Sequence, residues 1–196
     1  MEIKYPTGKK AKKTPTRKKI KSRIILNAAN RGMALEVDLN LANAYYQEKN
    51  IATITKRPTP IRVVKVDYSK GAKITEAFFE KQSTTDYNGI YKGKYIDFEA
   101  KSVSLKTRFP LANITPHQFS HLQSVINHGG IAFFIIEFST FDEVYLLDAS
   151  LLISAHNEGK KSIPYNKIKE KGHLITRKLA PRLDYLKVVD AVYFKE

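Results

Sequence analysis

The feature that most constrains the fold of this chain is an unbroken apolar run at residues 131–136, Ile-Ala-Phe-Phe-Ile-Ile. It follows Gly129 and Gly130 and is short enough for a strand. A strand on the surface of a sheet alternates between apolar and polar residues, and this one does not. The run therefore predicts a strand that is buried on both of its faces.

Hydrophobic periodicity predicts the elements around this strand. Apolar residues at three- and four-residue intervals predict a helix over residues 30–46, with Asn30 as its N-cap and Asn50 at its end. A second helix is expected to begin at Thr115 and Pro116. The remaining predicted elements are an extended segment at 51–55, a hairpin over 87–101, a strand at 144–147, and helices at 149–155 and 181–193. This order predicts a single α/β domain over residues 24–196, in which helices flank a central mixed β-sheet.

Residues 56–82 interrupt that pattern. Two prolines close together at 58 and 60 exclude a central strand, because proline lacks the donor that such a strand needs. A strand is expected at 61–68, a turn at 69–71, and an extended or helical piece at 74–81. We interpret residues 58–81 as a projection from the domain. Its lysines alternate with aromatic residues, which suits either contact with nucleic acid or packing in the core; these aromatics are Tyr68, Phe78 and Phe79.

The charge of the chain points to a polyanionic partner. The formal net charge is +15, with 34 Lys and Arg against 19 Asp and Glu among 196 residues. Residues 1–23 contain ten of these basic residues and a single acidic one, and they have little to bury. We expect a disordered, DNA-binding arm there, with a solvated tail as the alternative. The basic residues expected to contact DNA are Lys9, Lys10, Lys12, Lys13, Arg17, Lys18, Lys19, Arg31, Lys56, Arg57, Lys65, Lys70 and Lys73.

Composition also indicates a cellular compartment. The chain contains no cysteine, so disulfides and thiolate metal sites are excluded. No apolar run is long enough to cross a bilayer, and no h-region follows the basic N-terminus. We therefore expect a soluble cytoplasmic protein that does not act in a membrane.

The hairpin at 87–101 carries the residues with the clearest chemistry. Asp86 precedes it, and Glu99 and Lys101 lie two residues apart on its second strand. Alternation along that strand turns Phe98 and Ala100 toward a core and places Glu99 and Lys101 together on the other face. The pattern suits either a metal-binding nuclease site or an ordinary solvated strand face.

A phosphodiester nuclease needs a cation, an activated water and stabilisation of the transition-state charge. Magnesium prefers oxygen ligands, so Asp86 and Glu99 can supply two carboxylates. Thr84 can add a hydroxyl or backbone oxygen, and Gln118 can contact a metal-bound water. Lys101 can orient or deprotonate the water, or donate to the developing negative charge.

Four motifs together resemble one family. They are Asn30-Arg31-Gly32-Met33-x-Leu35-Glu36, Thr84-x-Asp86-Tyr87-x-Gly89, Tyr95-x-Asp97-Phe98-Glu99-Ala100-Lys101 and Thr115-x-His117-Gln118. With them the chain resembles the RecU Holliday junction resolvases, a branch of the PD-(D/E)xK nuclease superfamily. The resemblance runs from about residue 24 to the C-terminus. One departure from the superfamily pattern is that Thr85, and not proline, precedes Asp86.

This resemblance implies a restriction-endonuclease-like nuclease fold with a stalk that enters the centre of the junction. It implies a bacterial homodimer that resolves four-way DNA junctions by paired symmetric nicks during homologous recombination and DNA repair. The implied cofactor is Mg²⁺, for which Mn²⁺ can substitute, and a recombinase is an implied partner, with Arg31 and the basic tail as its contacts. The implied roles are metal binding for Thr84, Asp86, Glu99 and Gln118, stabilisation of the transition state for Lys101, and a secondary catalytic role for Glu36.

The sequence leaves other interpretations open. His117 and His121 lie four residues apart, which suits zinc binding or two histidines on a helix surface. Asp97 shares a face with Glu99 and is either a third metal ligand or a structural residue. The whole chain could instead be a non-catalytic nucleic-acid-binding protein, or a different endonuclease of the same superfamily.

Overall fold

The structure is a computed structural model that describes residues 28–80 and 84–194, without the side chains of residues 28–31. The predicted basic arm at 1–23 lies outside the described residues, and so do its candidate DNA contacts and the Arg31 side chain. Among the helices described, none is long and apolar enough to cross a membrane.

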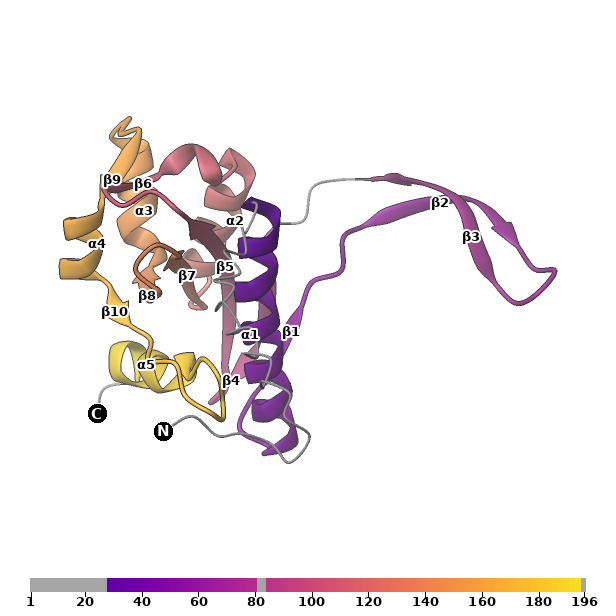
Figure 1. Cartoon of the computed structure of the whole chain (residues 1–196), viewed down its shortest axis with the longest axis horizontal. Coiled ribbons are helices and arrows are strands. Elements are labelled where there is room, and N and C mark those ends of the chain that lie inside the picture. The colour runs from indigo at the N-terminus through magenta and orange to yellow at the C-terminus, as the bar shows by residue number, and fades with distance from the viewer. Residues whose placement is uncertain (1–27, 81–83, 195–196) are drawn as a thin grey trace, which may run out of the picture.

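A six-stranded mixed sheet forms the centre of the molecule, as predicted (Figure 1). Its strand order is β1-β4-β5-β7-β8-β10, in which β5 and β7 run parallel and every other neighbouring pair is antiparallel. The strands are β1 (Thr53–Lys56), β4 (Tyr87–Tyr91), β5 (Lys94–Val103), β7 (Ile131–Phe138), β8 (Glu143–Asp148) and β10 (His173–Leu174). A small second sheet pairs β6 (Arg108–Pro110) with β9 (Ser162–Pro164).

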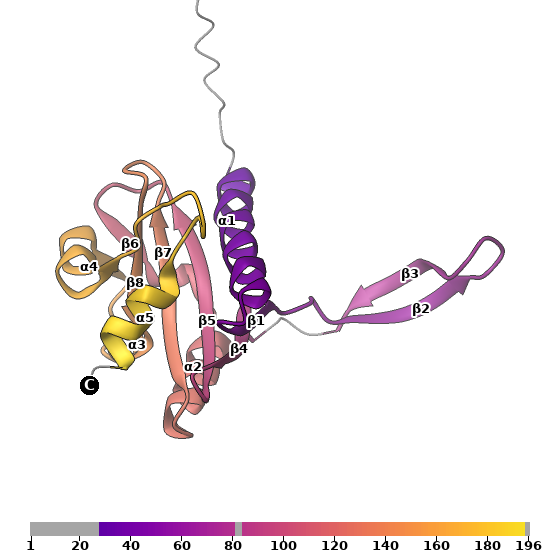
Figure 2. The same ribbon diagram turned by 90° about the horizontal axis from the view of Figure 1, so that it is seen from below.

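Helices cover both faces of the sheet, which completes the predicted layered fold (Figure 2). The helices are α1 (Ala28–Glu48), α2 (Pro116–Asn127), α3 (Ala149–Asn157), α4 (Tyr165–Lys171) and α5 (Tyr185–Tyr193), with a 3-10 turn, η1 (Leu111–Asn113). Strand β7 is buried along its whole length: Phe133 packs in the core formed with α1 and α5, and Phe134 in the core formed with α2, α3 and α4. The apolar run is therefore the two-faced strand that the sequence predicts.

The ends of the helices differ from the predictions in two places. Helix α1 begins at Ala28, so Asn30 lies inside the helix, and the prediction of Asn30 as N-cap is wrong. Two alanines at its start are strong helix formers, which explains the extension. At the other end Asn50 takes a left-handed φ of 54°, so its predicted role in ending this helix is confirmed. The last helix begins at Tyr185 and not at residue 181.

Gly89 on β4 allows strand β1 to approach closely. A Cβ at this position would overlap the Thr53 carbonyl oxygen and lie 2.6 Å from Ile54 Cα. Because both are backbone atoms of a paired strand, they cannot move aside without breaking the β1–β4 pairing. The glycine is therefore required for the edge of the sheet next to Asp86.

Replacing Gly89 with alanine should destabilise the fold by roughly 3 kcal/mol or more, because the overlap cannot relax. Gly32→Ala in α1 is the matched control, since its added Cβ meets no described atom within 4 Å. That change should raise stability by up to about 1 kcal/mol through helix propensity. Denaturant unfolding of both variants measures the difference. Equal stabilities would contradict the close approach of β1.

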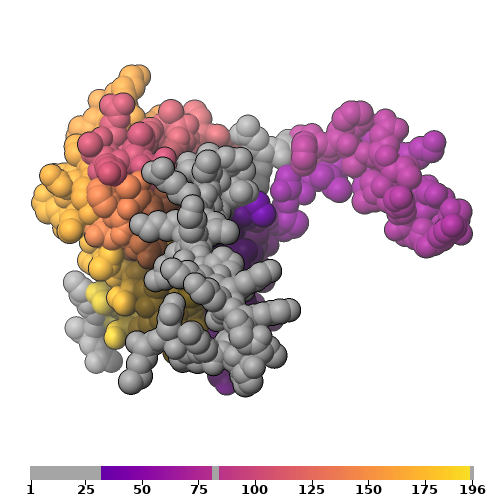
Figure 3. Space-filling view, viewed as in Figure 1, coloured from indigo at the N-terminus to yellow at the C-terminus, as the bar shows by residue number. Residues whose placement is uncertain are grey.

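Strands β2 (Ile61–Asp67) and β3 (Lys73–Phe79) form a two-stranded ribbon that extends away from the body in both ribbon views (Figures 1 and 2). We call it the projecting hairpin. Of the predicted piece at 74–81, residues 74–79 are thus extended and not helical. Its aromatic residues are exposed, with Phe79 at 81% and Tyr68 at 75%, so the alternative that they pack in the core of this chain is wrong. The space-filling view shows the hairpin standing clear of the body (Figure 3).

Candidate active site

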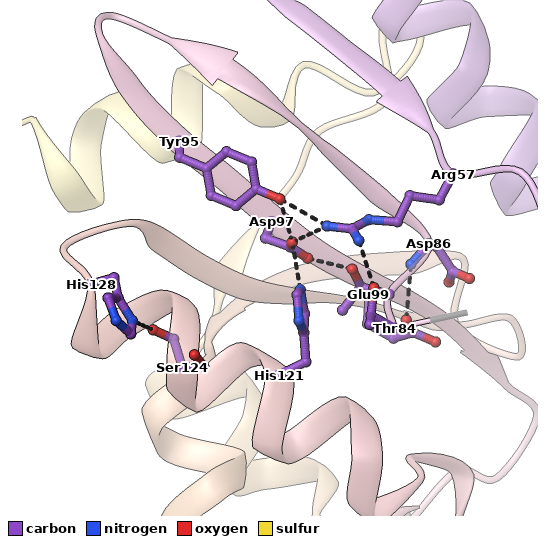
Figure 4. Close-up of polar contacts among 10 residues, drawn as sticks. Arg57, Thr84, Asp86, Tyr95, Asp97, Glu99, His121, Ser124 and His128 are labelled. Carbon is purple, nitrogen blue, oxygen red and sulfur yellow. Dashed lines mark hydrogen bonds and ion pairs between the residues drawn. The ribbon is translucent and has the colours of Figure 1, made fainter. Parts of the chain in front are cut away.

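The hairpin of β4 and β5 brings the two predicted carboxylates together. Tyr87 pairs with Phe98, which places Asp86, just before β4, beside Glu99 on β5. The Asp86 amide donates to Glu99 Oε2 at 3.1 Å (Figure 4), and the Ala100 amide donates to Asp86 Oδ2 at 3.1 Å. Each carboxylate is thus fixed by a main-chain donor of the other strand. Pairing between the strands sets the relative position of the two acidic groups.

Glu99 is fully buried, so the interpretation of its strand face as solvated is wrong. Its Oε1 accepts from Lys101 Nζ and from Gln118 Nε2, each at 2.6 Å. Burial, together with the negative charge of Asp86, raises the pKa of Glu99 to about 7, although Lys101 and Gln118 act in the opposite direction. The site therefore holds an acidic group whose ionised form is disfavoured without an additional positive charge.

Gln118 reaches Glu99 from the first turn of α2. Thr115 caps this helix: its Oγ1 accepts from the Gln118 amide at 3.3 Å, and Gln118 Oε1 accepts from the Thr115 amide at 3.0 Å. This reciprocal capping box uses the side-chain oxygen of Gln118 and turns its amide hydrogens toward Glu99. The predicted helix start at Thr115 and Pro116 is therefore confirmed. In this arrangement Gln118 contacts the site as a donor.

Arg57 directly follows β1 and binds the loop of residues 84–86, which carries Asp86. Its main-chain amide donates to the Asp86 carbonyl oxygen at 2.8 Å, and its Nη1 donates to Thr84 Oγ1 at 2.6 Å. Its Nη2 lies 2.5 Å from Asp97 Oδ2 and 2.8 Å from the Tyr95 hydroxyl. The guanidinium is thus turned inward beside the carboxylates (Figure 4).

Asp97 is a buried carboxylate on the same face of β5 as Glu99. Its Oδ2 also accepts from the Tyr95 hydroxyl at 3.0 Å and lies 2.8 Å from His121 Nε2, and its Oδ1 accepts from Thr85. These donors occupy Asp97, which supports the structural interpretation over that of a third ligand.

The histidine pair is not arranged as a zinc site. His121 points at Asp97, while His117 is exposed on the first turn of α2. Across residues 28–80 and 84–194, no three side chains of the His, Asp and Glu types gather as a metal would need. A metal at this site would therefore be bound by two carboxylates and neutral oxygens, the ligand set that suits magnesium.

The residues at Asp86 and Glu99 fit a divalent cation. Glu99 is buried, and the negative charge of Asp86 helps to raise its pKa. A cation between them would compensate both the repulsion and the burial. Thr84 lies two residues before Asp86 in the same loop, and its hydroxyl accepts from Arg57 at 2.6 Å.

The other predicted site residues lie outside this cluster. Glu36 on α1 pairs with Lys56 at 2.5 Å, and both side chains are partly exposed, with values of 39% and 41%. Lys65, Lys70 and Lys73 are exposed on the projecting hairpin. Arg57 is held by the contacts described above, so its predicted contact with DNA stays a prediction.

Sequence reasoning missed the network around Asp97. In the sequence, Arg57 is only a positive charge next to two prolines, and Tyr95 is only part of a motif. Their common partner lies 40 residues from Arg57 in the sequence. No local spacing indicates a contact over that distance, so the network becomes visible only when β1 is placed in the sheet.

Two carboxylates joined at one hairpin of a mixed sheet, with a lysine two residues after the second, are typical of a metal-dependent phosphodiester nuclease. The model of one family, Recombination protein U or RecU, matches residues 30–191. The chain belongs to the RecU family, as its motifs indicate.

Relatives match along nearly the whole length. Holliday junction resolvase RecU of Geobacillus kaustophilus (strain HTA426) is 52% identical over 200 residues, which cover 99% of this chain and 99% of that protein. The protein of the same name from Bacillus thuringiensis (strain Al Hakam) is 50% identical over 206 residues, which cover 99% of this chain and all of that protein.

Proposed function

We propose that this chain is a metal-dependent endonuclease that resolves four-way DNA junctions by paired nicks during recombination and repair. Membership in the RecU family and the names of its relatives support this function. The observation that carries the proposal is the contact of Lys101 with buried Glu99 beside Asp86. These three groups combine a cation site with a positively charged donor at one point of the surface.

Each residue then has a definite task. Asp86, Glu99 and Thr84 hold the cation, Mg²⁺ with Mn²⁺ as a substitute, and Gln118 orients Glu99 or a water beside it. A metal held there would polarise the phosphate and lower the pKa of a bound water. Lys101, whose ammonium contacts Glu99 at 2.6 Å, would donate to the negative charge that develops on the phosphate. Glu36 contributes indirectly, through Lys56 and the position of α1.

The projecting hairpin supplies contacts to DNA in this proposal. Its exposed lysines 65, 70 and 73 neutralise phosphates, and its exposed aromatic residues offer flat surfaces on which bases can stack. The basic residues at 1–23 add a second set of phosphate contacts. Together these groups recognise the shape of a branched duplex and not its base sequence.

We also propose that the chain acts as a homodimer. A four-way junction has two-fold symmetry, so paired nicks need two active sites related by one isologous interface. Helix α1 offers an apolar stripe for such an interface, in which Met33, Val37 and Leu41 are all more than half exposed. A recombinase is a further proposed partner. Because the substrate is chromosomal DNA, the proposed place of action is the bacterial cytoplasm.

Cleavage of an intact four-way junction, compared with a linear duplex of the same sequence, tests this function. With Mg²⁺ at constant salt, we expect the junction to be cut at least ~100-fold faster, a difference of ~2.7 kcal/mol in transition-state free energy. On a supercoiled cruciform, both nicks should appear in one binding event. Affinity should also fall steeply with salt, by about 0.9 log units per log unit for each phosphate contacted. Equal cleavage of both substrates would indicate a different endonuclease, and binding without cleavage would indicate a non-catalytic binder.

A further inference from the structure

We infer that Arg57 is a positioning residue for the metal site. It holds the loop of residues 84–86 against Asp97, so that the oxygens that would bind the cation keep fixed relative positions. This inference rests on the proposed function, because it assigns a role within the same site. In this role Arg57 does not bind the cation itself. Its task is to hold the residues that bind the cation.

The geometry shows why one side chain can do this. The Arg57 amide binds the Asp86 carbonyl at 2.8 Å, and its Nη1 binds the Thr84 hydroxyl at 2.6 Å. Its Nη2 lies 2.5 Å from buried Asp97 on β5, two residues before Glu99. Arg57 therefore connects the loop that carries Asp86 and Thr84 to the strand that carries Glu99.

The position of Arg57 in the chain gives this connection a further consequence. In the chain, the projecting hairpin lies between Arg57, which directly follows β1, and Thr84, which precedes β4. Both ends of that insertion are thus tied together at Arg57, beside the candidate metal site. Without the guanidinium, the Thr84 hydroxyl would lose its donor and its connection to Asp97, and the oxygens of this loop would lose their fixed position.

Only an arginine can make this set of contacts. A guanidinium has two terminal nitrogens in a fixed planar fork, which serve Thr84 with one arm and Asp97 with the other. A lysine ammonium could keep the ion pair with Asp97 but could not also reach Thr84 in the same geometry. Tyr95 and His121 fix the Asp97 carboxylate from its remaining sides, so the anchor is itself rigid.

The first experiment measures cation binding directly. Mn²⁺ binding to the full chain, followed by the loss of the free-ion electron paramagnetic resonance signal, needs no cleavage. Arg57→Gln and Arg57→Lys should both weaken Mn²⁺ binding by ~10–100-fold, the usual effect of removing a group that orients metal ligands. Unchanged Mn²⁺ affinity in both variants would overturn the inference.

Arg177→Gln is the matched control. Arg177 is 22% exposed, as is Arg57, and it pairs with Asp38, Glu137 and Asp142. Of its acidic partners, Asp38 lies on α1, and Glu137 shares the face of β7 that packs in the core formed with α1, whereas Glu99 contacts Gln118 of α2. This variant should lose stability while it keeps Mn²⁺ affinity within about twofold, since no ligand depends on it. A similar loss of affinity in Arg177→Gln would assign the effect to general destabilisation and overturn the inference.

The double variant Arg57→Gln/Asp97→Asn separates positioning from folding. Neutralising both partners removes the unpaired buried charge that Arg57→Gln leaves behind, so thermal stability should return toward that of the natural chain. Mn²⁺ affinity and junction cleavage should remain low, because Thr84 still lacks its donor. If Mn²⁺ affinity and junction cleavage both recovered together with thermal stability, the positioning role would be overturned. If the natural chain itself bound Mn²⁺ but cut no junction, the proposed function would fail while the Mn²⁺ comparison still tested Arg57.

Discussion

Replacing Asp86 with asparagine should reduce metal-dependent junction cleavage by ~10³-fold or more while junction binding persists. Asparagine keeps the shape of the side chain, and its oxygen can still accept from the Ala100 amide, a bond of 3.1 Å in the natural chain. It loses the negative charge that would attract a cation beside Glu99. Metal ions contribute several kcal/mol to the stabilisation of the transition state, which corresponds to this loss of rate.

Single-turnover cleavage and gel-shift binding, measured on the same preparation, separate the two effects. Asp142→Asn is a suitable control, because Asp142 is 79% exposed in a turn with a left-handed φ of 55°, which asparagine accepts. It should cleave like the natural chain. Cleavage by Asp86→Asn near the natural rate would remove Asp86 from the metal site. Loss of binding together with cleavage would assign Asp86 to DNA recognition.

Replacing Glu99 with glutamine should change how stability depends on pH. In the folded chain the pKa of Glu99 is raised to about 7 from an ordinary value of 4.5, mainly by burial. A raised pKa means that the folded state holds its proton more tightly than the unfolded state. This contribution to stability is full below about pH 4.5 and is lost as the pH rises through about 7, by roughly 3 kcal/mol without metal.

The variant should lack that decline, because glutamine does not ionise. Denaturant unfolding in chelator at about pH 5 and about pH 8 measures it as the difference between the two proteins. At high pH, Glu99→Gln should be more stable than the natural chain by less than this calculated loss. The reason is that an amide cannot accept all three bonds that Glu99 accepts. Added Mg²⁺ should stabilise the natural chain at high pH, by ~2.7 kcal/mol at a hundredfold excess over its Kd, and Glu99→Gln much less. Parallel pH profiles would show that Glu99 is not the group that titrates.

The layered fold could be predicted because its signals are local. The apolar run of β7 and the Thr115 cap of α2 each act through neighbouring residues, and both are present in the structure. The weak elements β6, α4 and β10 were not predicted, because short segments in a polar stretch carry no periodicity. The prediction of Asn30 as N-cap is wrong because Ala28 and Ala29, which precede it, also favour the helix.

The candidate site divides in the same way. Spacing and family motifs predict its polar residues, and the structure places four of them in one cluster: Asp86, Glu99, Lys101 and Gln118. The sequence by itself determined the two-faced central strand, the acidic hairpin and the excess of positive charge, because each depends on residues that are close in the chain. Only the tertiary structure decided that Glu99 is buried and that Arg57 ties Thr84 to Asp97. Burial and contacts between distant segments exist only after β1, β4 and β5 have paired, and they set the charge balance at which a cation would bind.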